Sequence, residues 1–207
     1  MTILSPPLQS PVSHIVDCLA TLPVDQAESL PLAGVDKLVE VLENCISHYG
    51  ALDKDGKFLP LLFSFHKLSQ SRAAEAKSRL KERFLPTDDD RTQILGRGDS
   101  LPHKLLSMTN NSMFSEVREV IMSIFFELSD QNPTQFVHNV GFGNAAGYLS
   151  SKGIQISQQD LETEAAGPEV NPITGQRIDA EPDVPLPDMT DEEKEREAER
   201  LFVLFER

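Results

Sequence analysis

The 207-residue sequence lacks the features that place a chain in a membrane or on a nucleic acid. No apolar run reaches the roughly 18 residues that suggest a membrane span. The N-terminus, MTILSPPLQSPVSH, has neither the basic nor the apolar region of a signal peptide. The formal net charge is −14, whereas nucleic acids and anionic membranes select basic surfaces. We therefore expect a cytoplasmic protein, with the cell cortex as a second location, that binds neither.

Residues suited to metal binding or redox chemistry are also scarce. The two cysteines, Cys18 and Cys45, each fall on the apolar stripe of an expected helix, which favours two buried thiols over a disulfide. The five histidines are scattered, and no Cys/His cluster has zinc spacing. His66 and His138 lie on expected helices, where core or surface roles are commoner than general-base roles. We expect no covalent catalysis, no metal and no cofactor.

Apolar residues recur at helical spacing through the first 153 residues. Pro60, Pro102 and Pro133 suit first helical turns, and Gly50 suits a helix end. No segment alternates apolar and polar residues over five or more positions, so the body is predicted to be all-α. The expected helices lie at residues 11–22, 33–50, 58–71, 72–85, 100–110, 112–130, 132–139 and 144–153, and a polar loop at 85–100.

The order of these segments indicates a repeating array. A short helix, a longer amphipathic helix and a tight turn recur at a spacing of about 40 residues or more, as in an armadillo/HEAT-like helical-repeat solenoid. An irregular helical bundle fits the same periodicity equally well. We assign residues 1–153 to this helical body.

The composition changes after the helical body. Residues 154–189 are acidic, contain several prolines and have few large apolar groups, so we expect an extended or disordered linker. Fifteen acidic and six basic residues follow from Ser151 onward, which is −9 of the −14. Residues 190–207 restart a helix, in which Thr190 and Glu193 form a capping box. This helix stops on its most apolar turn, which suggests a fragment or an unusual gene model.

The stretch NVGFGNAAGYL, residues 139–149, raises the question of a nucleotide site. Gly141, Gly143 and Ala146 fit G-x-G-x-x-A, the spacing of a dinucleotide-binding loop. Such a loop follows a buried strand, but here a strong helix and a proline-started turn precede it. We predict a structural hinge instead. Gly141 and Gly143 would allow positive φ and close backbone approach between two short helices, and Asn144 would cap the second.

Three motifs in order carry a resemblance to a known family. They are FVHNVGFGNAAGYLSSKGI, then NPITGQ after an acidic spacer, then MTDEEKEREAERLFVLFER. This series closely resembles the C-terminal part of the synembryn family, and FLPTDDDRTQILGRGDSLPHKLLSMTNN resembles the run before that family's last repeats. The resemblance covers most of the chain from Phe84 onward. Family members are longer, so it also implies that repeats before this chain and a segment after it are missing.

The resemblance implies a fold and a function. The fold is an armadillo/HEAT-like solenoid, and the function is that of a guanine nucleotide exchange factor and folding chaperone for heterotrimeric G-protein alpha subunits. Exchange needs no bond chemistry, because a surface that prefers the nucleotide-free subunit shifts the population toward release. The family implies a two-part grip by a chain that we expect to be monomeric. The concave face would hold the alpha subunit's C-terminal helix, and the tail would reach across its nucleotide-binding domain.

The tail offers the candidate partner contacts. We expect four apolar residues to dock in a groove of the partner as one face of a helix, namely Leu201, Phe202, Leu204 and Phe205. Packing of these residues back on the solenoid is the alternative. Ser157 and Thr190 resemble acidophilic kinase sites, in a region where family members are phosphorylated. The alternative function is a helical-repeat adaptor without exchange activity, while a nucleotide-using oxidoreductase is disfavoured by the context of the glycines.

Overall fold

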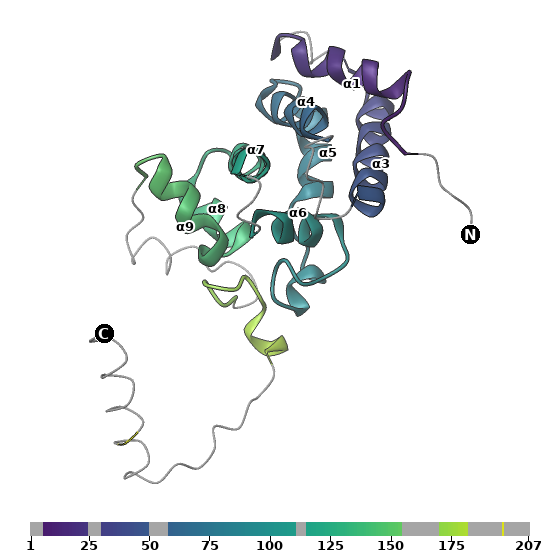
Figure 1. Cartoon of the computed structure of the whole chain (residues 1–207). Helices are drawn as coiled ribbons and strands as arrows, with labels where there is room; N and C mark the ends of the chain where they lie inside the picture. The colour runs from purple at the N-terminus through teal and green to yellow at the C-terminus, as the bar shows by residue number, and fades with distance from the viewer. Residues whose placement is uncertain are drawn as a thin grey trace, which may run out of the picture.

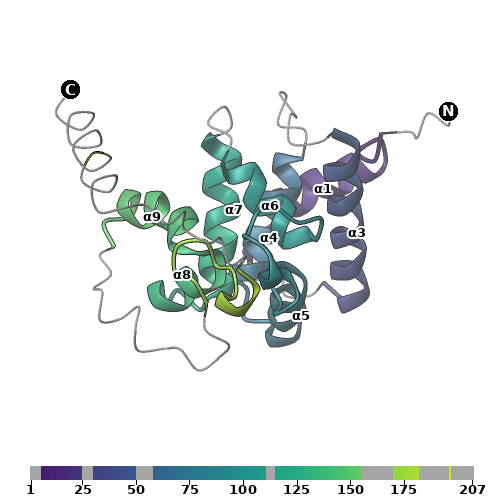
Figure 2. The ribbon, with the colours of Figure 1, turned by 90° about the horizontal axis from the view of Figure 1, so that it is seen from below.

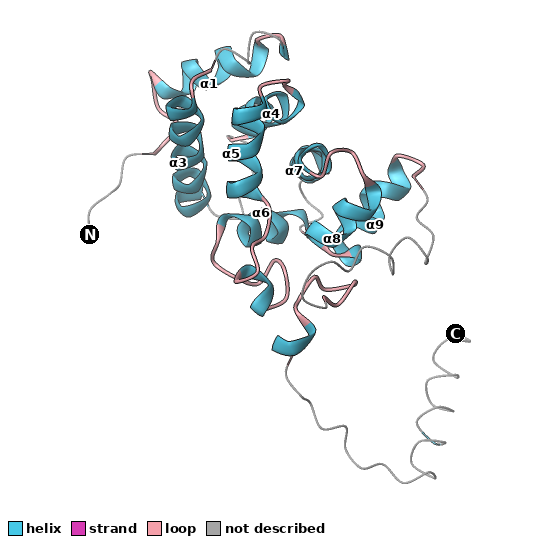
Figure 3. Cartoon of the chain, turned by 180° about the vertical axis from the view of Figure 1, so that it is seen from behind, coloured by secondary structure: helices cyan, strands magenta, loops and turns pink. Residues whose placement is uncertain are grey.

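The computed structural model describes residues 6–24, 30–49, 58–110, 115–154, 170–181 and 196. In these ranges the chain forms α-helices and two short 3-10 helices, with no strand (Figure 3). The all-α prediction is confirmed. None of the helices described is long and apolar enough to cross a bilayer. The elements are α1 (Val12–Thr21), α3 (Leu32–Tyr49), α4 (Leu59–Gln70), α5 (Ala74–Phe84), η2 (Asp90–Thr92), α6 (Leu101–Thr109), α7 (Ser115–Leu128), α8 (Pro133–Val140), α9 (Phe142–Ser151) and η3 (Ile178–Ala180).

Several helices begin where the sequence provides a start signal. Proline occupies the first turn of α4, α6 and α8, where its missing N–H is not needed. The Asn132 side chain caps α8, because its oxygen accepts from Thr134 N at 2.9 Å and Gln135 N at 3.2 Å. Ser100 stands at the N-cap position of α6, but its side chain makes no capping hydrogen bond.

The helices stack in two rows (Figures 1 and 2). In one row α1 packs on α4 and α4 packs on α7, while in the other α3 packs on α5 and α5 packs on α6. Contacts of α4 with α5, and of α7 with α5 and α6, join the rows. The pair α8 and α9 packs on α7 at the end of the stack. Each helix thus contacts its neighbours along the array, which is the arrangement of a helical-repeat protein.

The core between the rows is apolar, as the helical stripes predict. The buried apolar side chains of α3 are Val35, Leu38, Val39, Leu42, Cys45 and Ile46, and those of α7 include Val117, Ile121, Ile124, Phe125 and Leu128. Phe65 of α4 is fully buried, and its ring centroid lies 5.0 Å from that of Phe84 of α5. This ring pair fixes the contact between the two helices.

The prediction of two buried thiols is wrong for one cysteine. Cys45 is buried in α3, but Cys18 is exposed on α1. The reason is geometric, because α1 packs on α4 through the face that carries Val16, and a residue two positions further along a helix lies on the opposite side.

Polar contacts close the ends and edges of the stack. The Lys67 ammonium of α4 donates to the carbonyls of Ala20 at 2.5 Å and Leu22 at 2.6 Å, so it satisfies acceptors at the end of α1. On the surface, the Arg79 guanidinium of α5 grips the Asp36 carboxylate of α3 with two hydrogen bonds of 2.8 and 3.2 Å. These bonds lower the pKa of Asp36. Because the pair is exposed to solvent, it adds little to stability.

The packing of α4 leads to a stability prediction. Phe65→Ala should lower the free energy of unfolding by about 3–5 kcal/mol, because it removes a fully buried ring and leaves a cavity. Phe63→Ala, two residues earlier, should change it by less than about 1 kcal/mol, because that ring is 41% exposed. Urea denaturation of both variants beside the parent chain measures the difference. Equal destabilisation would contradict the orientation of α4.

Candidate functional site

Gly141 joins α8 to α9 with no intervening loop. It follows the last residue of α8 and precedes the first of α9, with φ 79° and ψ 144°. This backbone conformation is essentially restricted to glycine. A Cβ atom at this position would also lie 2.9 Å from the carbonyl oxygen of Ile173. Both the dihedral angles and the close approach therefore require glycine at residue 141.

The structure corrects two details of the predicted hinge. Gly143 does not have positive φ, because it lies in the first turn of α9, although a Cβ there would come within 3.1 Å of the Ile173 carbonyl oxygen. Asn144 does not cap α9, because the helix starts earlier, directly after Gly141. The Asn144 side chain instead donates to the carbonyl of Val140, the last residue of α8, at 2.7 Å.

Residues 170–181, here called the strap, lie against this junction (yellow-green in Figure 1). Phe142 N donates to the Pro172 carbonyl at 2.7 Å, and Gly143 N donates to the Ile173 carbonyl at 3.1 Å. The first amide groups of α9, which have no acceptor within the helix, are thereby satisfied. The strap belongs to the range predicted to be an extended linker, and for residues 170–181 that prediction is wrong. The backbone carbonyls of the strap accept hydrogen bonds from backbone amides of the body, and the amino-acid composition of the segment carries no sign of these bonds.

The glycine block therefore offers no dinucleotide site. A helix, and not a strand, enters Gly141, and the part of the chain that the structure describes has no sheet. The amide groups that would hold a phosphate at the start of α9 already donate to the strap. The close approach of two backbones explains the glycine spacing, as the mechanical interpretation of the block proposed.

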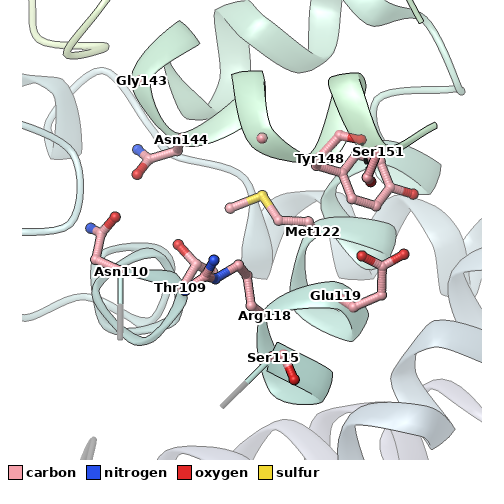
Figure 4. A pocket seen from close by; sticks show the side chains of 11 residues that line it. Thr109, Asn110, Ser115, Arg118, Glu119, Met122, Gly143, Asn144, Tyr148 and Ser151 are labelled. Carbon is pink, nitrogen blue, oxygen red and sulfur yellow. Dashed lines mark hydrogen bonds between the residues drawn. The ribbon is translucent and has the colours of Figure 1, made fainter. Parts of the chain in front are cut away.

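A groove lies on another side of α9, between α9, α7 and the end of α6 (Figure 4). It is open to solvent and has a volume of about 430 Å³. Met122 of α7 lies in its middle, and no atom would lie within 4 Å of a Cβ added at Gly147. The α9 side is formed by Gly143, Asn144, Gly147, Tyr148 and Ser151, and the opposite side includes Thr109, Asn110, Ser115 and Arg118.

The polar groups of the groove are mostly neutral. Glu119 accepts a hydrogen bond of 2.6 Å from Lys152, whose ammonium lies 5.3 Å from the centroid of the Tyr148 ring. The Tyr148 hydroxyl lies 3.3 Å from the Ser123 hydroxyl, and burial raises the pKa of Tyr148. Small residues, one methionine and neutral hydrogen-bonding groups suit a peptide or a helix better than a highly charged small molecule.

Three histidines of the body lie in different surroundings. His66 is half-buried on α4, with its Nε2 atom 3.2 Å from Gln70 Nε2, and burial lowers its pKa. His138 is exposed on α8. His103, which the sequence did not single out, is buried. Its ring accepts from Gly96 N at 3.0 Å and lies 2.9 Å from the Asp90 carbonyl, so it holds the loop between α5 and α6.

The remaining predicted site residues lie outside the described residues. They are the tail contacts Leu201, Phe202, Leu204 and Phe205 and the phosphorylation candidates Ser157 and Thr190. The sequence interpretation also missed the groove and the docked strap. The turn-forming motif NPITG, with Asn-Pro at its start and glycine near its end, was the one available sign that a folded turn interrupts the linker.

Comparison with known proteins identifies the family. The family described as "Guanine nucleotide exchange factor synembryn" matches residues 1–207. The chain belongs to the synembryn family. The protein named Chaperone Ric-8A of Danio rerio is 29% identical over an alignment of 225 positions, gaps included. The alignment covers 94% of this chain and 40% of the relative. Chaperone Ric-8A of Mus musculus is 32% identical over 144 residues, which cover 64% of this chain and 27% of the relative.

This synembryn chain thus spans about 40% of the length of the zebrafish relative. Chaperone Ric-8A of Xenopus tropicalis gives a similar result, with 29% identity over 93% of this chain and 38% of the relative. Two of the motifs that resemble the synembryn pattern, the glycine block and NPITG, contact each other in the structure, through hydrogen bonds from Phe142 and Gly143 to Pro172 and Ile173. The predicted membership is confirmed.

Substitution by alanine should change the free energy of unfolding in opposite directions at Gly141, which precedes α9, and at Gly147, which lies within it. Gly141→Ala should lower the free energy of unfolding by about 1–3 kcal/mol, because its dihedral angles exclude a side chain. Gly147→Ala should raise it by about 0.5–1 kcal/mol, because a methyl group fits there without contact and alanine favours a helix. Thermal or urea unfolding measures both changes. Similar effects of the two substitutions would contradict the junction geometry.

Proposed function

We propose that this chain binds the alpha subunit of a heterotrimeric G protein and acts on it as a guanine nucleotide exchange factor and folding chaperone. The observation that carries the proposal is the match to the synembryn family over residues 1–207. Relatives named Chaperone Ric-8A support the chaperone role. The action would be binding alone, with no covalent step.

The groove beside α9 is our candidate for part of the partner surface. Gly143, Gly147 and Ser151 lie four residues apart on one face of α9 and line the groove. Small residues at this spacing allow another helix to approach closely. Hydroxyl and amide groups on the rim, such as those of Thr109 and Asn110, can bond the polar ends of a docked helix.

Exchange follows if the groove and the tail favour one state of the alpha subunit. A ligand shifts a two-state equilibrium only by its difference in affinity for the two states, and a shift from 1:99 to 99:1 needs about 5.5 kcal/mol. If two linked contacts each prefer the same state, their differences in affinity add. We propose the apolar tail residues as the second contact, with the chain acting as a cytoplasmic monomer. Phosphorylation at Ser157 or Thr190 stays a prediction.

Filling the groove tests its role. Gly147→Leu should weaken binding of a purified alpha subunit by about ten-fold or more, because a leucine side chain occupies the space of the partner helix. Ser78→Leu adds the same side chain at an exposed position on α5 and should leave the affinity unchanged. Calorimetric titration measures both. If Gly147→Leu binds as tightly as the parent chain, the groove is not the docking surface.

The tail is tested in the same way. A variant with Leu201→Asp and Phe205→Asp should bind the alpha subunit more weakly, because charged residues cannot enter an apolar groove of the partner. Its helical content by circular dichroism should stay unchanged. An unaltered affinity would reject the tail as a contact.

Nucleotide release from the alpha subunit separates the two candidate functions. Faster release of bound nucleotide in the presence of this chain supports exchange. Binding without faster release supports the alternative, an adaptor or a chaperone without exchange activity. No binding at all would reject the proposed function.

A further inference from the structure

The two ends of α9 are held by different elements. In its second half, the Tyr148 hydroxyl lies 3.3 Å from that of Ser123 on α7. Near its end, Lys152 donates to Glu119, also on α7, at 2.6 Å. In the first turn the Phe142 side chain is 40% exposed, and the backbone amides donate to the middle of the strap. The position of the first turn therefore depends on the strap more than that of the second half does.

The strap is itself bound to the loop between α5 and α6. The Arg91 side chain of this loop is 3% exposed, and its guanidinium donates to the Gly175 carbonyl at 3.1 Å. The Arg91 carbonyl accepts from Arg177 N at 2.7 Å. Gly175 has φ +70°, and a Cβ atom there would collide with the buried side chain of Leu95. The strap and the loop fit so closely that no side chain can be added at residue 175.

The same loop is fixed to α6. The ring of His103, a buried residue of α6, accepts from Gly96 N at 3.0 Å and lies 2.9 Å from the Asp90 carbonyl. A strap that is bound to this loop is therefore bound to α6 as well. The other end of α6, with Thr109 and Asn110, forms part of the side of the groove that faces α9.

The strap is a folded turn, so it can transmit a constraint from one contact to the other. The Asn171 side-chain oxygen accepts from Ile173 N at 2.9 Å and from Thr174 N at 3.3 Å. Gly175 N donates to the Asn171 carbonyl at 2.9 Å. These bonds fix the carbonyls that face α9 relative to the residue that faces Arg91.

The strap thus connects the two sides of the groove. α6 and α9 both pack on α7, and the strap adds a second connection between them that does not pass through α7. Gly143 donates to Ile173 in the middle of the strap and also lines the groove. If the strap were released, the first turn of α9 would lose its acceptors, while Tyr148 would still hold the second half. The groove would then change shape at the Gly143 end.

We propose that the docked strap is a tie between α6 and the first turn of α9, and that Arg91 and Gly175 are positioning residues that keep the groove in its binding shape. A groove that is held in shape before binding loses less conformational entropy when a partner helix docks. This role needs no contact between the strap and the partner. The tie stands on the contacts above, whereas its effect on binding rests on the proposed function.

Hydrogen exchange of single backbone amides, followed by NMR, tests the tie. Gly175→Ala should raise the exchange rates of the Phe142 and Gly143 amides by about ten-fold or more, because their acceptors are carbonyls of the strap. The Leu149 amide, in the second half of α9, should exchange at the parent rate. Unchanged rates at Phe142 and Gly143 would overturn the tie. An equal increase at Leu149 would overturn it too, because the strap would then stabilise all of α9 alike.

Two further variants separate release of the strap from backbone strain. Gly153→Ala is the matched control, since Gly153 has φ +68° but no atom within 4 Å of an added Cβ, and it should leave the exchange at the start of α9 unchanged. Gln176→Ala removes the hydrogen bond of 3.2 Å to the Thr92 carbonyl without adding a clash. It should raise the exchange rates by a smaller factor than Gly175→Ala. The reverse order of these two variants, Gly153→Ala and Gln176→Ala, would overturn the tie.

The effect on the groove is tested by affinity for the alpha subunit in a double-mutant cycle. Gly175→Ala should weaken binding by about three-fold or more in the parent chain, because the groove is no longer held in shape. In the Gly147→Leu background, where the groove is filled, the same substitution should weaken binding by less than about two-fold. An equal loss in both backgrounds would mean that the strap acts elsewhere, and would overturn the positioning role. No loss in the parent chain would overturn it as well.

Failure of the proposed function gives a different result. If the parent chain does not bind an alpha subunit, the positioning role falls together with the proposed function, while amide exchange at Phe142 and Gly143 still shows whether the tie exists. If the parent chain binds and Gly147→Leu weakens binding, unchanged affinity of Gly175→Ala overturns the positioning role alone.

Discussion

The first amide groups of α9 must find acceptors, and this requirement organises the C-terminal half of the molecule. Gly141 precedes the helix and has no side chain that could cap it. The backbone amides of Phe142 and Gly143 therefore donate to carbonyls thirty residues further along the chain. Two backbones can come this close only if no side chain intervenes, which explains the glycines on the α9 side. The same contact ties a segment of the acidic region to the body.

The rest of the fold supplies the platform for that contact. α4 packs on α1, α5 and α7, and α7 packs on α5 and α6, so these two helices hold the rows of the array together. At the far end α9 contacts α7 only lightly, and the space between them remains as the groove. The strap and the groove meet at Gly143, which gives a synembryn-family chain two adjoining surfaces on one short helix. The strap also contacts the loop between α5 and α6. Buried His103 accepts a hydrogen bond from this loop, and buried Arg91, which belongs to the loop, donates to the strap.

Most of the helices could be predicted from the sequence, since the information is local. The stripe of α3 and the signals Asn132 and Pro133 at the start of α8 depend only on residues a few positions apart. The errors arose where a distant contact decides. Cys18 faces solvent because α4 contacts a different face of α1. Asn144 loses its capping role because α9 starts earlier, directly after Gly141, where the strap accepts hydrogen bonds from the first amide groups.

By itself, the sequence determined the all-α class, the helix positions, the need for glycine at residue 141 and the family. Helical periodicity and turn residues indicate the local structure that each segment prefers on its own. The order of the motifs indicates common ancestry with the family. Only the tertiary structure decided that residues 170–181 dock, that Arg91 is buried against Gly175, and that a groove remains beside α9. Every residue except proline carries the same backbone donor and acceptor, so the sequence does not show which carbonyl will pair with which amide. The pairs are decided only when the whole chain packs.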